Sequence, residues 1–261
     1  MIVAITGAAR GIGYATAQAL LAKGATVVIG DIDETAVAEA AEKLGVRGLK
    51  LDVTSRESFE AFLAEAGEYD VLINNAGIMP IGSVLEESDA DARRCIDINV
   101  HGVMLGTKIA LKRFVPLGKG HVINIASLAG VLATPGLALY NASKAAVVLF
   151  TEAARDEVKK HGVHVSAVLP SFTNTELVAG TRSPKGQKNC EPSDIADAIV
   201  GLIAKPRPQV VIPKKFAANV RIAGLLPQKV KDAANKRYGL DTIFLEFDHD
   251  ARKSYDSRIR D

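Results

Sequence analysis

The chain alternates short apolar runs with longer segments whose apolar positions recur at helical spacing. The apolar runs predict strands at residues 2–6, 26–30, 48–51, 70–74, 121–126, 163–169 and 209–212. The longer segments predict helices at residues 11–23, 34–44, 55–66, 89–114, 139–160 and 192–204. Strands and helices that alternate in this way form βαβ units, which give a parallel sheet covered on both faces. We therefore predict an α/β fold of three layers, with a doubly wound, parallel, seven-stranded, Rossmann-like sheet.

Two segments depart from this alternation. Residues 171–191 are polar and contain Gly, Pro and Thr, which predicts a flexible loop beside the substrate. Residues 213–261 follow the last strand and are predicted to form a helical C-terminal extension to a single catalytic domain over residues 1–212. Apolar and basic residues mix near the start of this extension. That mixture is compatible with a helix over the site entrance, a subunit interface or a weak contact with an anionic membrane surface.

The composition narrows the class of protein. The chain has 261 residues and a formal net charge of +2, so a dedicated nucleic-acid binder is not expected. Cys95 and Cys190 lie far apart and outside any Cys/His cluster, which argues against a metal site and favours a reducing, cytoplasmic location. Residues 122–143 are uncharged but contain Asn, Ser, Thr and Pro, so we expect no membrane span there.

The first strand runs into the glycine-rich sequence Thr6-Gly7-Ala8-Ala9-Arg10-Gly11-Ile12-Gly13. Between a strand and a helix, such glycines let the backbone approach a pyrophosphate at the helix N-terminus. Asp31 ends the second strand, where a carboxylate can bind the ribose hydroxyls of the cofactor and repel a 2′-phosphate. Arg10 favours the opposite choice because a guanidinium can pair with that phosphate. We give Asp31 more weight and expect NAD rather than NADP.

Tyr140 and Lys144 are four residues apart on a predicted helix and therefore share one face. An ammonium near a phenol lowers the pKa of the phenol towards working pH, as an acid/base tyrosine requires. Ser127 at the end of the fifth strand and Asn99 in the preceding long helix add two polar groups to the same region.

Together these features resemble the classical short-chain dehydrogenase/reductase superfamily. The resemblance is carried by the glycine-rich sequence, Asp52-Val53, Asn74-Asn75-Ala76-Gly77, Asn99, Ser127 and Tyr140-Asn141-Ala142-Ser143-Lys144. It implies that Tyr140 donates and accepts the proton, while Lys144 binds the nicotinamide ribose and lowers the pKa of Tyr140. It also implies that Ser127 binds the substrate oxygen and that Asn99 anchors a water linked to Lys144.

The same resemblance implies cofactor contacts along the whole edge of the sheet. They are expected from Gly7, Arg10, Ile12, Asp31, Asp52, Val53, Asn75, Gly77, Tyr140, Lys144, Pro170, Thr173 and Thr175. The chain departs from the family at Ser171, where the family usually has glycine after the proline. Serine has less backbone freedom than glycine, so this loop is the least certain part of the resemblance.

The residues near the expected site indicate an apolar substrate. They are Met79, Ile81, Leu128, Val131, Leu132, Leu137, Leu139, Phe172 and Leu177. We therefore expect an NAD(H)-dependent oxidoreductase that interconverts a secondary alcohol and a ketone on a steroid-, retinoid- or lipid-like molecule. The alternatives are an NADP-dependent carbonyl reductase and a non-catalytic dinucleotide-binding sensor or scaffold. The two long helices resemble those that build family tetramers, so a homo-oligomer, either dimer or tetramer, is expected.

Overall fold

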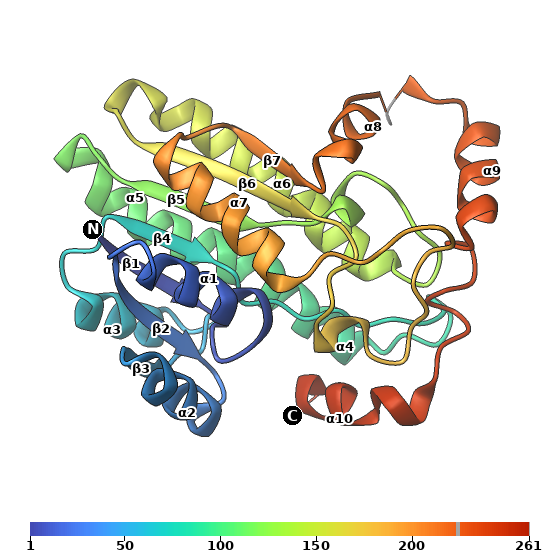
Figure 1. Cartoon of the computed structure of the whole chain (residues 1–261), viewed down its shortest axis with the longest axis horizontal. Helices are drawn as coiled ribbons and strands as arrows, with labels where there is room; N and C mark the ends of the chain where they lie inside the picture. The colour runs from blue at the N-terminus through green and yellow to red at the C-terminus, as the bar shows by residue number, and fades with distance from the viewer. Residues whose placement is uncertain (223–224, 261) are drawn as a thin grey trace.

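A parallel sheet forms the centre of the molecule. The computed structural model describes residues 1–222 and 225–260, and in it seven strands follow the order β3-β2-β1-β4-β5-β6-β7 (Figure 1). The strands are β1 (Ile2–Thr6), β2 (Thr26–Asp31), β3 (Arg47–Lys50), β4 (Val71–Asn74), β5 (His121–Ile125), β6 (His164–Pro170) and β7 (Gln209–Ile212). Every neighbouring pair is parallel. The predicted doubly wound sheet is confirmed, and each strand ends within one residue of its predicted position.

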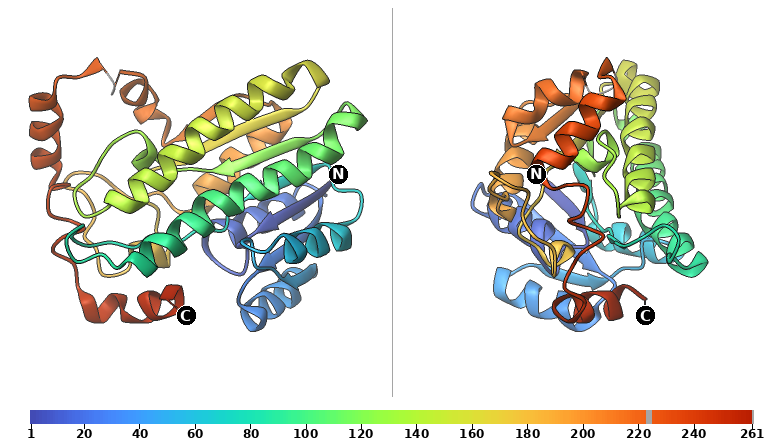
Figure 2. Two further views of the ribbon diagram at one scale, coloured as in Figure 1. Left: turned by 180° about the vertical axis from the view of Figure 1, so that it is seen from behind. Right: turned by 90° about the vertical axis from the view of Figure 1, so that its right-hand side faces the viewer.

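Helices cover both faces of the sheet, as the near-continuous apolar strands require. On one face lie α1 (Gly11–Leu21), α2 (Glu34–Leu44) and α7 (Pro192–Ala204), packed on inward side chains such as Ile5 and Ile29. On the other face lie α3 (Arg56–Ala66), α5 (Val103–Leu117) and α6 (Ala138–Val158), which pack on Ala4, Val28 and Leu72 (Figure 2). Successive strand residues point to opposite faces, so each strand contributes to both cores.

The predicted helix over residues 89–114 is interrupted. It consists of α4 (Asp89–Ile96), a π-helical turn (Asp97–Gly102) and α5, which continues through Pro116. The expected stop before Pro116 is wrong because this proline falls in the last turn, which Gly118 then ends at φ +64°. The π-helical turn contains Asn99, and such turns occur frequently at functional sites.

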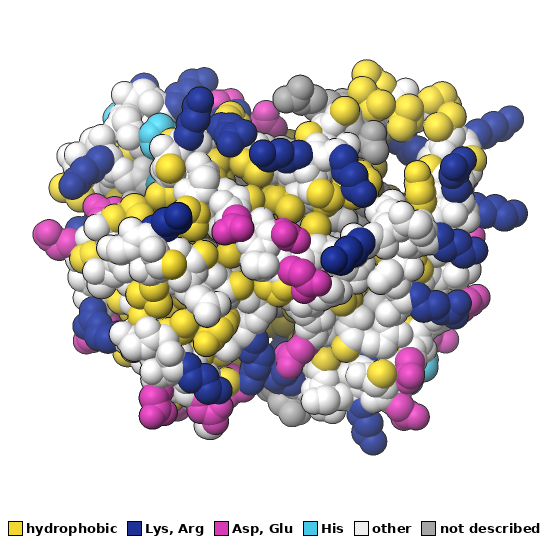
Figure 3. All heavy atoms as spheres, in the orientation of Figure 1, with side chains coloured by type: hydrophobic (Ala, Val, Ile, Leu, Met, Phe, Trp, Pro, Cys, Tyr) yellow, Lys and Arg dark blue, Asp and Glu magenta, His cyan; other side chains and the backbone are white. Residues whose placement is uncertain are grey.

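The C-terminal extension curves around the carboxyl edge of the sheet. It contains α8 (Ala217–Ile222), α9 (Gln228–Tyr238) and α10 (His249–Arg260), while residues 223–224 and 261 lie outside the described residues (Figure 1). Phe216 and Val220 pack against the domain, whereas Ile222 and Leu225 are exposed. Apolar side chains gather at the corner where α8 lies, with basic side chains around them (Figure 3). Within the described part, no helix is long and apolar enough to cross a membrane.

Candidate active site

A cavity of about 1550 Å³ lies at the carboxyl ends of the strands. At this edge lie the carboxyl ends of β1 and β4, the neighbouring strands between which the strand order reverses. Open α/β sheets bind their ligands at this position. The cavity is lined by every residue predicted for the site except Asn99. The sequence motifs therefore converge on one space, although they are spread over most of the chain.

The glycine-rich turn packs directly against the loop that follows β4. Gly7 has φ +63°, and a Cβ added to it would lie 2.6 Å from the Cα of Ala76. A Cβ on Gly13 would lie 2.5 Å from the carbonyl oxygen of Gly7. Only glycine fits either position, and the turn brings its backbone to the cavity wall.

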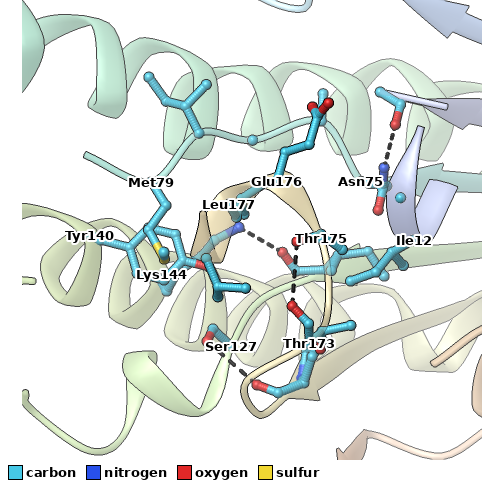
Figure 4. A pocket seen from close by; sticks show the side chains of 18 of the residues that line it. Ile12, Asn75, Met79, Ser127, Tyr140, Lys144, Thr173, Thr175, Glu176 and Leu177 are labelled. Carbon is cyan, nitrogen blue, oxygen red and sulfur yellow. Dashed lines mark hydrogen bonds between the residues drawn. The ribbon is translucent and has the colours of Figure 1, made fainter. Parts of the chain in front are cut away.

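Asn75 supports this turn. Its Nδ2 donates hydrogen bonds to the carbonyl oxygens of Thr6 and Gly7, at 3.0 and 2.7 Å, and Figure 4 shows Asn75 with one such bond. At the start of α1, the N-cap residue Arg10 makes no side-chain cap, so the first-turn N–H groups have no side-chain acceptor there. Backbone N–H groups and a positive helix end suit a pyrophosphate. The glycine cradle and this uncapped helix end fit a dinucleotide cofactor.

Two carboxylates border the cavity at the end of β2. Asp31 accepts hydrogen bonds from the backbone N–H groups of Ala9 and Asp33, at 3.1 and 3.2 Å. Asp33 also forms an ion pair with Arg10, at 2.7 Å between Oδ2 and Nη2. A hydrogen bond from the N–H of Ala36 and the contact with Arg10 lower the pKa of Asp33. Arg10, the one residue that favoured NADP in the sequence, therefore already has the Asp33 carboxylate as its partner.

Asp33 was not among the residues singled out from the sequence. It is the N-cap of α2, and its side chain accepts from the N–H of Ala36. A sequence reader can recognise an aspartate that begins a helix. The pairing with Arg10 has no local signal because it depends on how two βα turns pack.

Tyr140, Lys144 and Ser127 lie together at the other end of the cavity (Figure 4). Tyr140 and Lys144 are buried on the same side of α6, and Nζ of Lys144 lies 5.6 Å from the centroid of the Tyr140 ring. The Oγ of Ser127 donates to the carbonyl oxygen of Pro170 at 3.5 Å and accepts from the N–H of Ala129 at 3.1 Å. The arrangement places two hydroxyl groups and an amine beside the same space.

Burial dominates the titration of this group. It raises the pKa of Tyr140 above its ordinary value, although the nearby hydroxyl of Ser127 acts in the opposite direction. Burial also lowers the pKa of Lys144 to about 8, while Nζ donates to the carbonyl oxygen of Ile125 at 2.9 Å. The shift of Tyr140 is opposite to the one expected from Lys144. Desolvation disfavours both charged forms here and is the largest cause of each shift.

Asn99 lies directly behind the cavity wall. Its Oδ1 accepts from the N–H of Ile78, and its Nδ2 donates to the carbonyl oxygen of Ile78, each at 2.8 Å. Nδ2 also donates to Oγ of Ser143 at 3.0 Å. A Cβ added to Gly77 would lie 3.1 Å from Oδ1 of Asn99 and 3.4 Å from Nζ of Lys144. Asn99 thus holds the loop after β4 against the helix that carries Tyr140.

The remaining predicted cofactor residues line the middle of the cavity. Asp52 accepts from the N–H and hydroxyl of Thr54, at 2.9 and 2.7 Å. After β6 the chain crosses the cleft, so that a Cβ added to Gly11 would lie 3.4 Å from a methyl group of Thr175. Ser171 does not adopt a positive φ, and its N–H donates to Ile212. The serine that departs from the family pattern therefore causes no backbone strain.

The substrate end of the cavity is apolar. Six of the expected side chains line it: Met79, Leu128, Leu132, Leu137, Phe172 and Leu177. Ile81, Val131 and Leu139 do not line it. Six further residues of the lining come from the extension: Phe216, Leu240, Phe244, Tyr255, Arg258 and Ile259. Phe244 stacks on Phe172 with 5.4 Å between the ring centroids, a contact that no sequence motif signalled.

Known proteins share both the sequence and the fold. The sequence profile described as short chain dehydrogenase matches residues 1–186. EphD of Mycobacterium tuberculosis, described as a probable oxidoreductase, is 34% identical over 90% of this chain and 45% of its own length. The chain therefore spans under half the length of that relative. The cis-4-hydroxycyclohexanecarboxylate dehydrogenase of Sinomonas cyclohexanicum is 39% identical over 77% of this chain and 88% of its own.

Among solved structures, a short chain dehydrogenase/reductase from Burkholderia phymatum in complex with NAD has a TM-score of 0.78 with this chain. The two share 26% identity over 90% of this chain and 95% of the other. Sequence profile, relatives and fold agree with the motifs that meet in the cavity. The chain belongs to the short-chain dehydrogenase/reductase family.

Proposed function

We propose that the chain is an NAD(H)-dependent oxidoreductase that interconverts a secondary alcohol and a ketone, with Tyr140 as its acid and base. The observation that carries this proposal is the position of Tyr140. The residue is buried, lines the same cavity as Ser127 and Lys144, and shares that cavity with the glycine-rich turn. A non-catalytic dinucleotide sensor has no need for this arrangement of two hydroxyls and an amine.

In alcohol oxidation, Ser127 and Tyr140 bind the substrate oxygen, and Tyr140 takes the proton of the alcohol. Tyr140 enters this step as the phenolate, which Lys144 stabilises by its charge, and leaves it as the neutral phenol. In reduction, Tyr140 returns this proton to the carbonyl oxygen. The nicotinamide, when bound, accepts the hydride of the carbinol carbon in oxidation and supplies it in reduction. Asn99 acts on this chemistry through Ile78 and Ser143, which it holds in place.

The charges around the end of β2 support NAD as the preferred cofactor. Asp31 and Asp33 both border the cavity there, and Arg10 is paired with Asp33. A 2′-phosphate would meet two carboxylates and no unpaired guanidinium from Arg10. The glycine-rich turn, Asn75 and the first turn of α1 would hold the pyrophosphate.

The lining of the substrate end supports an apolar secondary alcohol. Phe172, Phe244, Leu137 and Met79 surround the space beside Tyr140. The Sinomonas relative is named for a substrate whose hydroxyl group lies on a cyclohexane ring, which is also a secondary alcohol. We propose cyclic or long-chain apolar alcohols as the substrate class.

The test is turnover by the wild type and by Tyr140→Phe, followed as NADH absorbance with cyclohexanols, 2-alkanols, a steroid alcohol and small polar alcohols. Removal of the acid/base group is expected to lower kcat by about 10²–10⁴-fold. NAD affinity, measured by calorimetry, is expected to stay unchanged, and NADP to bind about tenfold more weakly than NAD. Tyr238→Phe, which lies outside the cavity, is the matched control.

Full turnover by Tyr140→Phe would contradict the acid/base assignment. Equal affinity for both dinucleotides would contradict the cofactor assignment. Oxidation of the small polar alcohols alone would contradict the apolar substrate class.

A further inference from the structure

Arg252 of α10 is buried completely, with 0% of its surface exposed. Its Nη1 donates to the carbonyl oxygens of Leu177 and Ala179, at 2.7 and 3.1 Å, and its Nη2 donates to that of Met79 at 2.5 Å. Nε donates to Asp256 at 2.9 Å, so the buried charge has a partner on its own helix. A single guanidinium therefore ties the loop after β4 to the loop after β6.

The same helix also satisfies the other backbone group of Met79. The N–H of Met79 donates to the hydroxyl oxygen of Tyr255 at 2.9 Å. Buried backbone groups need partners, and each one left unpaired costs about 1–3 kcal/mol. Residues of α10 therefore bind both the N–H and the carbonyl group of Met79, and they fix the backbone of the loop after β4 at this residue.

Further contacts attach the loop after β6 to the extension. The N–H of Asp248 donates to the carbonyl oxygen of Gly180 at 2.9 Å, and Arg258 forms an ion pair with Glu176. The 3-10 turn Glu176–Val178 lies between these contacts. Together they hold this loop across the cavity.

The two tied loops form the walls of the substrate end. Met79 and Leu177 both line the cavity, and Met79 packs in one apolar cluster with Leu137, Tyr140 and Phe244. The distance between these walls sets the width available to a substrate next to the hydroxyl of Tyr140. A shift of either loop changes that width without touching the glycine-rich turn.

We propose that Arg252 is a positioning residue that fixes the separation of these two loops and thereby selects the apolar alcohols that bind productively. The proposal rests on the proposed function, because it assigns the specificity of that same site. Arg252 touches neither substrate nor cofactor and acts through Met79 and Leu177. A lysine carries the charge but lacks the planar set of donors that reaches all three carbonyl groups.

The experiment compares Arg252→Gln and Arg252→Lys with wild type and with Lys253→Gln, which removes a charge from the exposed side of the same helix. Loop opening is followed by tryptic cleavage after Arg182, Lys185 and Lys188, identified by mass spectrometry. These sites are exposed in the loop after β6. Steady-state kinetics with bulky and small alcohols and NAD calorimetry complete the measurements.

Both Arg252 variants are expected to be cleaved in this loop about tenfold faster, because local opening costs less once the three carbonyl bonds are lost. KM for bulky apolar alcohols is expected to rise about tenfold, while NAD affinity remains within twofold of wild type. The preference for bulky over small alcohols then falls. Lys253→Gln is expected to match the wild type in every measurement.

Unchanged cleavage and unchanged KM in Arg252→Gln would overturn the proposal. A parallel loss of NAD affinity would also overturn it, because it would indicate general damage to the domain. If neither Arg252 variant folds, Tyr255→Phe removes the acceptor of the Met79 N–H and keeps the ring that lines the cavity. It is expected to raise the same KM about threefold, and an unchanged KM would count against the proposal. If the wild type oxidises no alcohol, the proposed function fails, while tryptic cleavage still decides whether Arg252 holds the loop.

Discussion

At its cofactor end the cavity is shaped by backbone, whereas its substrate end is shaped by side chains that reach in from the last part of the chain. Gly7 and Gly13 fit the first end because no Cβ can be placed there. Arg252 and Phe244 define the second end from a segment that follows the last strand. The first end depends on local sequence, and the second depends on where a distant helix packs. Substitutions are therefore expected to affect the two ends separately.

The largest effect is expected at the cofactor end from Gly13→Ala. The new methyl group would lie 2.5 Å from the Gly7 carbonyl oxygen and 2.6 Å from Nδ2 of Asn75, so the turn must move. We expect NAD affinity to fall about hundredfold, or about 2.7 kcal/mol, in a calorimetric titration. Gly201→Ala in α7 is the matched control, since its methyl group would meet nothing within 4 Å. An unchanged affinity in Gly13→Ala would contradict a backbone-built cofactor end.

Lys144 lies where the two ends meet, and its burial is expected to cost stability. Its folded-state pKa is about 8, against the ordinary 10.5. Between these values the unfolded chain binds a proton that the folded chain lacks, so stability rises with pH across this window. The stability of Lys144→Met does not rise with pH in this window, because methionine has no ionisable group. Although the substitution removes the hydrogen bond to Ile125, we expect it to be more stable than wild type by on the order of 1 kcal/mol at pH 7.

The stability of wild type relative to Lys144→Met is expected to rise as pH rises from about 8 to 10.5, measured by urea unfolding at several pH values. Lys112→Met, at an exposed position of α5, is the control and is expected to show no such change. A constant gap between the two proteins would show that Lys144 keeps its ordinary pKa in the fold.

A smaller effect is expected at the substrate end from Phe244→Ala. Loss of the ring removes the stacking on Phe172 and widens the cavity. We expect KM for bulky apolar alcohols to rise about fivefold, or about 1 kcal/mol, with NAD affinity unchanged. Phe247→Ala, a nearby residue outside the cavity lining, is the control. If Phe244→Ala weakened NAD binding as strongly as Gly13→Ala, the two ends would not be separate.

The sequence predicts the parts of this molecule that local patterns encode. Apolar runs locate the inner strands because a strand buried on both faces must be apolar along its length, whereas the edge strand β3 contains Arg47 and Lys50 and is exposed at both ends. The motifs around Gly7, Ser127 and Tyr140 are equally local, and the structure brings them to one cavity. The π-helical turn at Asn99 escaped prediction because its apolar spacing resembles that of an ordinary helix.

The features that escaped prediction depend on packing between distant segments. Arg252 looks like a surface residue in a basic, polar helix, yet it is buried because three carbonyl groups from other loops meet it. Asp33 pairs with Arg10 only after two turns approach each other. Burial raises the pKa of Tyr140, and this desolvation, unlike the nearness of Lys144, cannot be seen along the chain.

The short segment after β4 contacts the glycine-rich turn, Asn99 and the C-terminal helix α10. Asn75 holds the glycine-rich turn, Ile78 is held by Asn99, and both backbone groups of Met79 are bound by α10. These few consecutive residues lie between the dinucleotide turn and the last helix of the chain, and they contact both. Within five residues the backbone thus passes from a support of the dinucleotide turn to a segment that the last helix holds in place.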